Sequence, residues 1–433
     1  MTLSESRTPF RGRLSRIIVA EPHEVAAVAA GFALFFLLFS SYFMLRPVRE
    51  TMGVAGGVEN LPWMFTGTFL ATLVLVPFYG WLSSRVPRRW LLPAAYGFVA
   101  LTLVGFAAVL MTSPGDVWMG RAFYIWISVV NLFVFSLGWS LMADVFRAEQ
   151  ARRLFGQVAA GASLGGLAGP LLSGLLVGTV GEPGLLVISA GLMLASLLAV
   201  RQLLSWRQRN GPVEPAEQAP SRPIGGNIFA GLTLILRSPF LLGLSAFVVL
   251  LASVNTFLYL EQARLVELTF SDRAQRTQAF AAIDVAVQSL TIFIQMFVTG
   301  RLTRKLGVTV LLTAVPVLMV AGLGLLAAAA TFPVLVGVMV LRRVGEYALV
   351  KPGRDMLFTT LDAETKYKAK NVIDTFVYRG GDAISAWVSK AVGALGMGAA
   401  LVMIVGAVLA GIWAAIGYGL GRVHDRRATE AGA

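Results

Sequence analysis

Strongly charged side chains lie inside or directly after long apolar segments of this sequence. The segment "GFALFFLLFSSYFMLRPVRETMGV" ends with Arg46, Arg49 and Glu50. A guanidinium can bind a phosphate or a carboxylate through two parallel hydrogen bonds, and a buried carboxylate can act as counterion or take up a proton. These residue types therefore predict either recognition of an anion or an ion pair that closes a path.

A second group of polar residues recurs at helical spacing in a later apolar segment. Asp284, Gln288, Thr291 and Gln295 fall on one face of a helix whose other faces are apolar. Such a stripe lines a cavity or forms a polar contact between helices, and the sequence leaves both open. Asp284 is one candidate for proton coupling, because a carboxylate inside a membrane is expensive unless it has a function or a partner.

The amino-acid composition indicates that these residues lie in a membrane protein. The 433-residue chain is 57% hydrophobic and 14% charged, whereas an average soluble domain is about 25% charged. We expect a multi-pass membrane protein embedded in a lipid bilayer. Cysteine is absent and the two histidines lie near the termini, so we expect no metal site, and we expect no cofactor. The net charge of +13 is explained by arginines between apolar runs, so we expect no nucleic-acid partner.

Apolar runs long enough to cross a bilayer predict about twelve helices in two halves. The fold class is therefore an all-α membrane protein with two six-helix halves. We expect a cytoplasmic tail over 1–24, a first half over 25–206, a linker over 207–236, a second half over 237–421 and a C-terminal tail over 422–433. Arginine and lysine clusters such as Arg85 and Arg301 follow alternate spans, which predicts that both termini are cytoplasmic. A bacterial inner membrane and a monomer are expected.

The two halves resemble each other in sequence, which is how transporters of the major facilitator type are built, with the substrate between the halves. "GWLSSRVPRRWLL" from Gly80 matches "GRLTRKLGVTVLL" from Gly300. In the first and seventh spans, Arg46 falls opposite Glu261 and Arg49 opposite Arg264. One interpretation is a gate in which Arg46 pairs with Glu261. The other is that Arg49 and Arg264 hold an anionic substrate, and the spacing favours neither.

The repeat also places a highly charged segment inside the membrane. "VLRRVGEYALVKPGRDMLF", residues 340–358, corresponds to the fourth span, so its charges must face protein or a wet cavity. Pro352 and Gly353 predict a kink there. Glu346 falls opposite Asn131, a further candidate substrate residue, which we expect at the same depth in the first half. The candidate substrate residues of this segment are Glu346, Lys351, Arg354 and Asp355.

One further pattern predicts close packing. Gly161, Gly165 and Gly169 are four residues apart in "GASLGGLAGPLL", and such ladders of small residues let two membrane helices approach closely. The main interpretation is structural packing, with sliding between states as the alternative.

Two stretches resemble the ATP:ADP antiporter family, the nucleotide transporters of plastids and obligate intracellular bacteria. "LRPVRETMGV" is similar to the Leu-Arg-x-x-Lys-Asp end of that family's first helix. "KPGRDMLFTTLDAETKYKAKNVIDTFVYRGGDA" is similar to its Pro-x-Lys-Glu-Met segment, the following charged loop and the next helix. The chain is identified as a member of this family or of its bacterial relatives within the major facilitator superfamily.

The resemblance implies particular substrate residues. Arg49 takes the position of a substrate-contacting lysine and Glu50 that of an aspartate. Arg354 and Asp355 take the Lys-Glu positions, and Arg379 is kept. The sequence departs from the family at Asp382, where the nucleotide carriers have a lysine. This change inverts a charge, and Asp382 becomes a candidate for substrate binding or proton coupling, as is Glu346.

The function expected is secondary transport of an anionic metabolite by alternating access, with nucleotide exchange of the ATP/ADP type implied by the resemblance. One alternative is a proton-coupled carrier of another zwitterionic or anionic solute. Another is a membrane scaffold that keeps the fold without transporting. No phosphate-binding loop and no nucleophile with its base is evident, so an enzyme is not expected.

Overall fold

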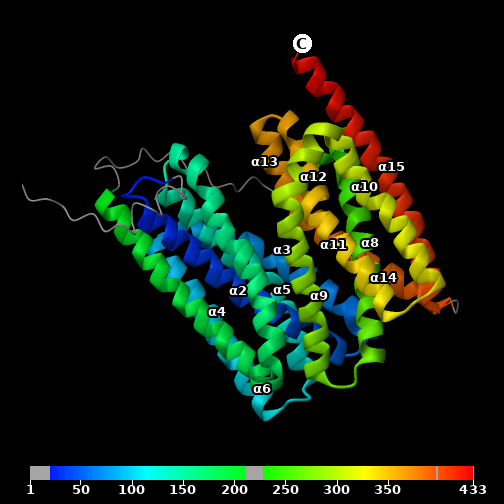
Figure 1. Cartoon of the computed structure of the whole chain (residues 1–433), viewed down its shortest axis with the longest axis horizontal. Helices are drawn as coiled ribbons and strands as arrows, with labels where there is room; N and C mark the ends of the chain where they lie inside the picture. Colours follow the sequence, from blue (N-terminus) through cyan, green and yellow to red (C-terminus); the bar gives the residue numbers. More distant parts are fainter. Residues whose placement is uncertain (1–19, 211–227, 396–397, 433) are drawn as a thin grey trace, which may run out of the picture. The chain divides into compact units, whose positions relative to one another are not determined.

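The computed structural model describes residues 20–210, 228–395 and 398–432, and over this part of the chain it contains helices and turns but no strand (Figure 1). Short 3-10 turns lie at η1 Val58–Asn60 and η4 Phe358–Thr360. The α-helices are α2 Val25–Ala55, α3 Leu61–Arg85, α4 Arg88–Thr112, α5 Val117–Val145, α6 Ala148–Asn210, α7 Ile228–Arg237, α8 Pro239–Thr269, α9 Arg273–Ile294, α10 Gly300–Ala328, α11 Phe332–Gly345, α12 Lys351–Leu357, α13 Ala363–Val372, α14 Tyr378–Ala394 and α15 Gly398–Gly432.

The described helices supply twelve membrane crossings, which confirms the predicted fold class. Nine helical stretches are long and apolar enough to cross a bilayer. One of them, α6, holds two crossings, because Gly181 breaks it with a φ of 67°, a conformation that glycine adopts without steric cost. The remaining two crossings, which precede α15, are α11 with α12 and α13 with α14, and each is interrupted by a π-helical turn.

Three crossings of the second half contain a π-helical turn. These turns are η2 Gln295–Thr299, η3 Glu346–Val350 and η5 Ile373–Val377. The turn η3 lies directly before Pro352, so the interruption is where the proline predicts one, because proline cannot donate the backbone hydrogen bond of a regular helix. Such turns often accompany functional sites.

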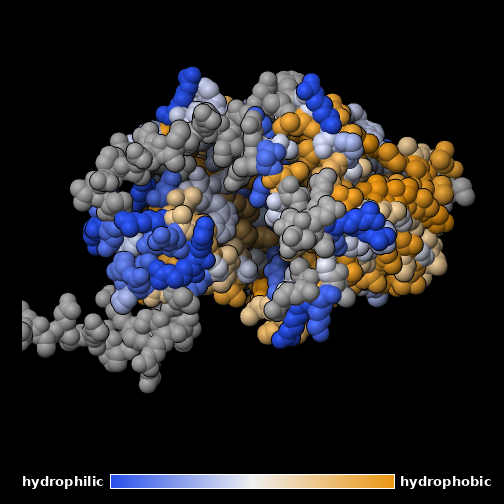
Figure 2. All heavy atoms as spheres, turned by 90° about the horizontal axis from the view of Figure 1, so that it is seen from above, coloured by the Kyte–Doolittle hydropathy of each residue, from blue (hydrophilic) through white to orange (hydrophobic). Residues whose placement is uncertain are grey.

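The outer surface of the helices matches a lipid environment. Leu101, Leu175 and Leu198 are each at least 67% exposed. Figure 2 shows broad hydrophobic areas on the face that it presents, together with separate hydrophilic patches. Aliphatic side chains at such exposure suit acyl chains better than water. The chain is a multi-pass integral membrane protein.

The helices form two compact units that do not coincide with the two halves. The first unit holds Met1–Val48, Ser83–Gly115 and Val130–Pro220. The second holds Arg49–Leu82, Asp116–Val129 and Ser221–Ala433. The C-terminal end of α2, nearly all of α3 and the N-terminal part of α5 are therefore grouped with the helices of the second half. The functional residues described below lie mainly in this second unit.

The predicted linker is only partly described. Residues 211–227 lie outside the described part of the chain, as do residues 1–19 of the predicted N-terminal tail. Within the linker, residues 228–237 form α7, which packs against α13. The domain boundaries drawn from the sequence stay a prediction.

The glycine ladder packs α6 against α2 in the first unit, which confirms the packing interpretation. A Cβ atom at Gly169 would meet the backbone of α2 at 2.7 Å, at both Ser40 O and Met44 N. Gly161 and Gly165 face Phe32 O and Phe36 O in the same way. Close backbone approach of this kind holds membrane helices together by van der Waals packing.

Substitution of Gly169 by alanine is expected to lower the melting temperature of the purified protein. The added methyl group meets backbone atoms, which cannot move aside as a side chain can, and overpacking of this kind costs about 1–3 kcal/mol. Gly156→Ala on the same helix is the matched control, since no atom lies within 4 Å of its added Cβ. Equal melting temperatures for the two variants would contradict this account of the ladder.

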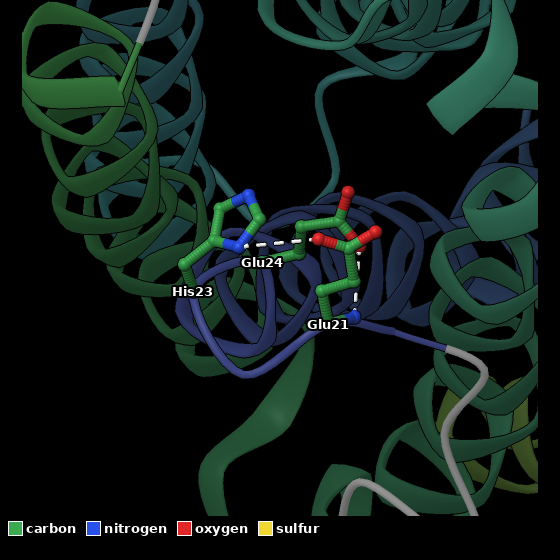
Figure 3. Close-up of side chains that lie close together, drawn as sticks. All are labelled: Glu21, His23 and Glu24. Carbon is green, nitrogen blue, oxygen red and sulfur yellow. Dashed lines mark hydrogen bonds and ion pairs between the residues drawn. The ribbon is translucent and has the colours of Figure 1, made fainter.

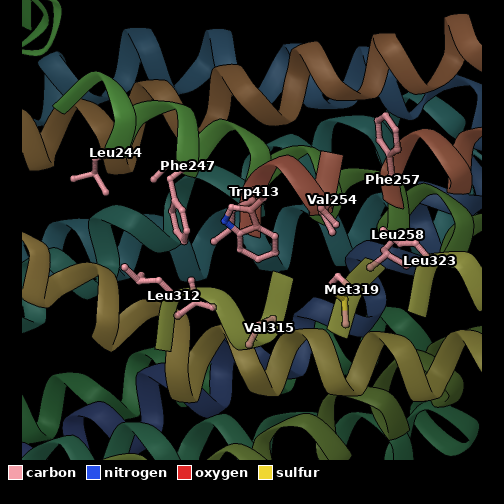
Figure 4. Packing of buried hydrophobic residues seen from close by; sticks show 14 of the residues in the cluster. Leu244, Phe247, Val254, Phe257, Leu258, Leu312, Val315, Met319, Leu323 and Trp413 are labelled. Atoms are coloured by element: carbon pink, nitrogen blue, oxygen red, sulfur yellow. The ribbon is translucent and has the colours of Figure 1, made fainter. Parts of the chain in front are cut away.

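The second unit has its own apolar core, formed by α8, α10 and α15. Trp413 of α15 packs on Phe247 of α8, with ring centroids 5.6 Å apart, and Leu312 and Met319 of α10 belong to the same buried cluster (Figure 4). Dense packing of this kind replaces the hydrophobic effect as the force that joins helices in lipid. This core fixes α8, which carries several of the polar residues of the site.

Candidate substrate site

The last turns of α2 bring Arg49 and Glu50 together inside the second unit. Arg49 Nη2 donates a hydrogen bond to Glu50 Oε1, and the two side chains are 12% and 8% exposed. Arg49 Nη1 also donates to Ser128 Oγ of α5 at 3.2 Å. Buried ion pairs are tolerated when both members are hydrogen-bonded, and both are here. Arg49 and Glu50 therefore face protein rather than lipid.

Two tyrosines complete the surroundings of Glu50. Tyr259 of α8 donates its hydroxyl proton to Glu50 Oε2. The hydroxyl of Tyr124, from α5, donates to the hydroxyl of Tyr259 at 3.0 Å. The guanidinium of Arg49 lies 5.2 Å from the centre of the Tyr124 ring, within the range of a cation–π contact. Glu50 thus joins α2 to α8.

Helix α14 contributes a second cation and carboxylate. Arg379 Nη1 lies 3.9 Å from Asp382 Oδ2, and Thr256 of α8 donates its hydroxyl proton to Asp382 Oδ1 at 3.1 Å. Arg379 Nη2 donates to the carbonyl oxygen of Ser128 at 3.2 Å. Ser128 therefore contacts both arginines, Arg49 through its hydroxyl and Arg379 through its carbonyl. Residues from α2, α5, α8 and α14 meet at this point.

The cluster is electrically balanced. Arg49 is matched with Glu50 and Arg379 with Asp382. Arg342 Nη1 donates to Glu346 Oε2 at 2.8 Å, and both groups lie within electrostatic range of Asp382. An incoming anion therefore meets arginines that already have carboxylate partners, and it has to compete with them.

The other charges of the predicted tenth span are distributed over separate contacts. Arg343 Nη1 of α11 donates to Asp284 Oδ1 of α9 at 2.5 Å, and both side chains are at most 5% exposed. Arg354 of α12 pairs with Asp374 at 3.0 Å. Asp355 Oδ1 accepts from Lys370 Nζ at 2.7 Å, and Lys351 is exposed.

These contacts do not join Lys351, Arg354 or Asp355 to the cluster around Arg49. Their assignment to the substrate site stays a prediction. The contact of Asp284 with Arg343 favours a structural role for Asp284, and its part in proton coupling also stays a prediction.

Arg264 and Glu261 form a pair of their own. Arg264 Nε and Nη2 donate to the two oxygens of Glu261 at 2.9 and 2.5 Å. Side chains three residues apart share one face of a helix, which explains how Arg264 reaches Glu261. Arg46 lies on α2 with its guanidinium 6.0 Å from the centre of the Phe43 ring. A gate between Arg46 and Glu261 stays a prediction.

A cavity of about 390 Å³ adjoins the Glu261–Arg264 pair. It lies in the second unit, between residues of η1, α8, α14 and α15, and its walls are mostly apolar. The lining residues include Val58, Glu59, Phe257, Lys390, Val402 and Met403.

The polar stripe of α9 forms a helix contact over part of its length. Besides Asp284, Gln295 Nε2 donates to the carbonyl of Tyr347 at 3.1 Å, which joins η2 to η3. Gln288 is partly buried. The helix-contact interpretation thus applies to Asp284 and Gln295, while a cavity role for Gln288 stays a prediction.

Asn131 belongs to the first unit, whereas the cluster around Arg49 belongs to the second. It lies on α5 and is partly buried, and its Oδ1 has no hydrogen-bond partner among the described residues. Its predicted equivalence to Glu346 is a matter of sequence alignment and stays a prediction.

A cluster of Glu21, His23 and Glu24 lies at the start of α2 (Figure 3). Glu24 Oε1 accepts hydrogen bonds from Arg153 at 2.9 Å and Gln150 at 2.8 Å. Arg153 also lies 3.6 Å from Glu21. The guanidinium of Arg153 already pairs with both carboxylates, so we assign the cluster to the attachment of α2 to α6.

Four residues of this cluster were not predicted from the sequence: Tyr124, Ser128, Thr256 and Tyr259. Each lies in an apolar span. Aromatic and small hydroxyl residues change the mean hydropathy of such a span only slightly, so they do not stand out as polar positions. A buried phenol hydroxyl nevertheless requires a hydrogen-bond partner. Tyrosines in the middle of apolar spans were therefore the available signal.

The sequence of this chain matches a known family of proteins with the same architecture. The family model of the Major Facilitator Superfamily matches residues 28–352, which is most of the chain. The chain belongs to the Major Facilitator Superfamily. This is a family of membrane transporters, and the twelve crossings and the two halves agree with it.

Two relatives at low identity align over most of the chain, and a third aligns over about half of it. The chain is 22% identical to ADP,ATP carrier protein 1 of Chlamydia muridarum (strain MoPn / Nigg), over 86% of this chain and 83% of the relative. Identity to ADP,ATP carrier protein 1 of Chlamydia pneumoniae is 23%, over 90% and 88%. Multidrug resistance protein MdtG of Serratia proteamaculans (strain 568) is 28% identical over 49% of each chain.

Solved structures agree with the fold. The nucleoside transporter NupG superposes with a TM-score of 0.64 at 13% identity, covering 92% of this chain and 98% of NupG. A bacterial homologue of the human lysosomal transporter Spinster, in an inward-facing and occupied conformation, gives a TM-score of 0.65 at 13% identity, covering 93% and 98%. At such identities the agreement concerns the fold alone.

Proposed function

We propose that this protein is a secondary transporter of an anionic metabolite, with a nucleotide as the first substrate class. The observation that carries the proposal is the position of Arg49, a buried guanidinium at the meeting point of α2, α5 and α8. Guanidinium suits phosphate and carboxylate because its N–H groups match two oxygens at once. The second arginine, Arg379, contacts the same residue, Ser128.

The balanced charge of the cluster limits the kind of anion. Arg49, Arg379 and Arg342 each have a carboxylate nearby, so a bound anion must displace or neutralise at least one of them. One phosphate or carboxylate group at Arg49 fits this arrangement. Two relatives that align over most of the chain are ADP,ATP carriers, and they favour nucleotides over other metabolites.

Transport in this proposal occurs by rocking of the two halves around the cluster. In the second unit, α2, α3 and α5 contact the second half through several hydrogen bonds. Thr51 pairs with Thr277 at 2.8 Å, and Trp387 Nε1 donates to Thr66 Oγ1 at 3.0 Å. If both termini are cytoplasmic, as the basic loops predict, these contacts close the outer side of the path.

A thermal-shift comparison tests the proposal. ADP, ATP and inorganic phosphate should each raise the melting temperature of the purified protein, because a ligand that binds only the folded state stabilises it by mass action. Uncharged adenosine should have a smaller effect. The double variant Arg49→Ala with Glu50→Gln should lose this rise in melting temperature. Arg121→Ala should keep it and is the matched control, because Arg121 contacts Gly56 O and the Trp118 ring. Equal shifts for adenosine and ADP, unchanged in the double variant, would refute the anion site.

Proton-coupled transport is the second candidate, and Asp382 favours it. This carboxylate is 5% exposed and has a hydroxyl donor in Thr256 and a cation in Arg379. A carboxylate that exchanges a proton during the cycle needs such a sheltered position with alternating partners.

Asp382→Asn separates the two candidates. In a proton-coupled carrier the variant should lose accumulation driven by a pH gradient by about tenfold or more, yet retain exchange of labelled for unlabelled substrate. Glu267→Gln serves as the control, since Glu267 is exposed near the end of α8. Accumulation equal to that of the native protein would remove Asp382 from the coupling mechanism, whereas a native protein that exchanges substrate but does not accumulate it under a pH gradient would leave simple exchange.

A further inference from the structure

Glu50 is the one carboxylate of the cluster that contacts both a cation of the first half and a hydroxyl of the second half. Its Oε1 accepts from Arg49 of α2, and its Oε2 accepts from Tyr259 of α8. The side chain is 8% exposed. Any event that removes Glu50 from Arg49 therefore also disturbs a contact between the two halves.

The hydrogen bonds around Tyr259 extend this connection. Tyr124 of α5 donates to the Tyr259 hydroxyl at 3.0 Å, and Tyr259 in turn donates to Glu50. Tyr259 also packs edge-on against Phe65 of α3, with ring centroids 5.4 Å apart. One residue of the second half thus contacts α2, α3 and α5 of the first.

We propose that Glu50 is an internal competitor for the anionic group of the substrate, and that Tyr259 is the positioning residue that links its displacement to separation of the halves. This inference rests on the proposed anion site at Arg49. Without substrate, Glu50 neutralises Arg49 and accepts the hydrogen bond from Tyr259, so the contact between the halves is made. With an anion on Arg49, Glu50 loses its cation and faces a like charge, which is unfavourable in a buried site.

In this proposal, binding of substrate breaks the hydrogen bond between Tyr259 and Glu50, which otherwise holds the two halves together. Glu50 must move or take up a proton when the anion arrives, and in either case it becomes a poorer acceptor for Tyr259. A ligand shifts a conformational equilibrium only by its difference in affinity for the two states. Competition with Glu50 supplies such a difference, because the anion can occupy Arg49 fully only when Glu50 has left it.

Two substitutions separate competition from linkage. Glu50→Gln removes the competing charge while its amide oxygen can still accept from Tyr259. Tyr259→Phe keeps the competing charge but removes the donor that joins the halves. Tyr418→Phe is the matched control, because Tyr418 lies exposed on α15 and accepts a hydrogen bond from Arg422 of the same helix.

A single cysteine can report the separation of the halves. The chain contains no cysteine, so Thr277→Cys introduces the only thiol. Thr277 is fully buried and contacts Thr51 of α2 at 2.8 Å. A maleimide should label this cysteine slowly while the halves are in contact and faster when they separate.

Tyr259→Phe should accelerate maleimide labelling about tenfold in the absence of any ligand, as expected for loss of one hydrogen bond to a charged group. Tyr418→Phe should leave the rate unchanged. A labelling rate in Tyr259→Phe equal to that of the parent Thr277→Cys protein would overturn the role of Tyr259.

Inorganic phosphate is the probe for the competitor. It should accelerate labelling of the parent protein, and in Glu50→Gln the half-maximal phosphate concentration should fall about tenfold, because the variant no longer has to displace a resident anion. A phosphate response in the parent protein without stronger binding in Glu50→Gln would overturn this inference and leave the proposed function intact. No response in either protein would overturn the anion site itself.

Discussion

Replacing Arg49 by alanine is expected to reduce substrate uptake into proteoliposomes by about ten- to hundredfold. Loss of a hydrogen-bonded cation costs about 1.5–3 kcal/mol of binding, and each 1.4 kcal/mol is a factor of ten. Arg49→Lys should lose less, because it keeps the charge but not the planar donor pair. The initial rate of uptake is the measurement.

Loss of uptake in Arg49→Ala has to be separated from loss of folding. The single substitution leaves Glu50 buried without its cation, which destabilises the protein. The double variant Arg49→Ala with Glu50→Gln removes the stranded charge, so its melting temperature should recover while uptake stays low. Arg121→Ala should retain uptake. Recovery of uptake in the double variant would show that Arg49 serves stability and not the substrate.

Breaking the pair between Asp284 and Arg343 is expected to have the largest effect on stability. Both side chains are at most 5% exposed, and they join α9 to α11. Substitution of Asp284 alone by alanine leaves a buried guanidinium without its counterion, which costs about 3–5 kcal/mol. A lower melting temperature in detergent and a lower yield of monodisperse protein are the observables.

The double substitution Asp284→Leu with Arg343→Met provides the control. It removes both charges and keeps much of the volume, so most of the lost stability should return. Transport by this double variant tests the predicted coupling role of Asp284. Retained accumulation under a pH gradient would assign the pair to stability, whereas a folded variant that exchanges substrate but no longer accumulates it would restore the coupling prediction.

Much of the fold was predictable because membrane spans are encoded locally. The number of crossings follows from the length of apolar runs, and a close helix contact of α6 follows from glycines four residues apart. The structure identifies α2 as the partner in that contact. Gly181 divides α6 into two crossings, and its backbone conformation is one that glycine favours.

The partners of the charged residues were less predictable, since they depend on how the helices pack. In the structure Glu261 pairs with Arg264, three residues away on the same helix, as the spacing along a single helix allows. The gate between Arg46 and Glu261, which rests on the alignment of the halves, stays a prediction. Tyr259 could not be assigned to Glu50 from sequence, because 209 residues separate them and only the packing of α8 on α2 brings them together.

Exchange across proteoliposome membranes tests the central claim most directly. Vesicles loaded with unlabelled ATP should take up labelled ADP at least about ten times faster with the native protein than with the Arg49→Ala and Glu50→Gln double variant. Empty vesicles should take up less than loaded ones. Uptake by folded native protein no faster than by protein-free vesicles would contradict nucleotide exchange at Arg49.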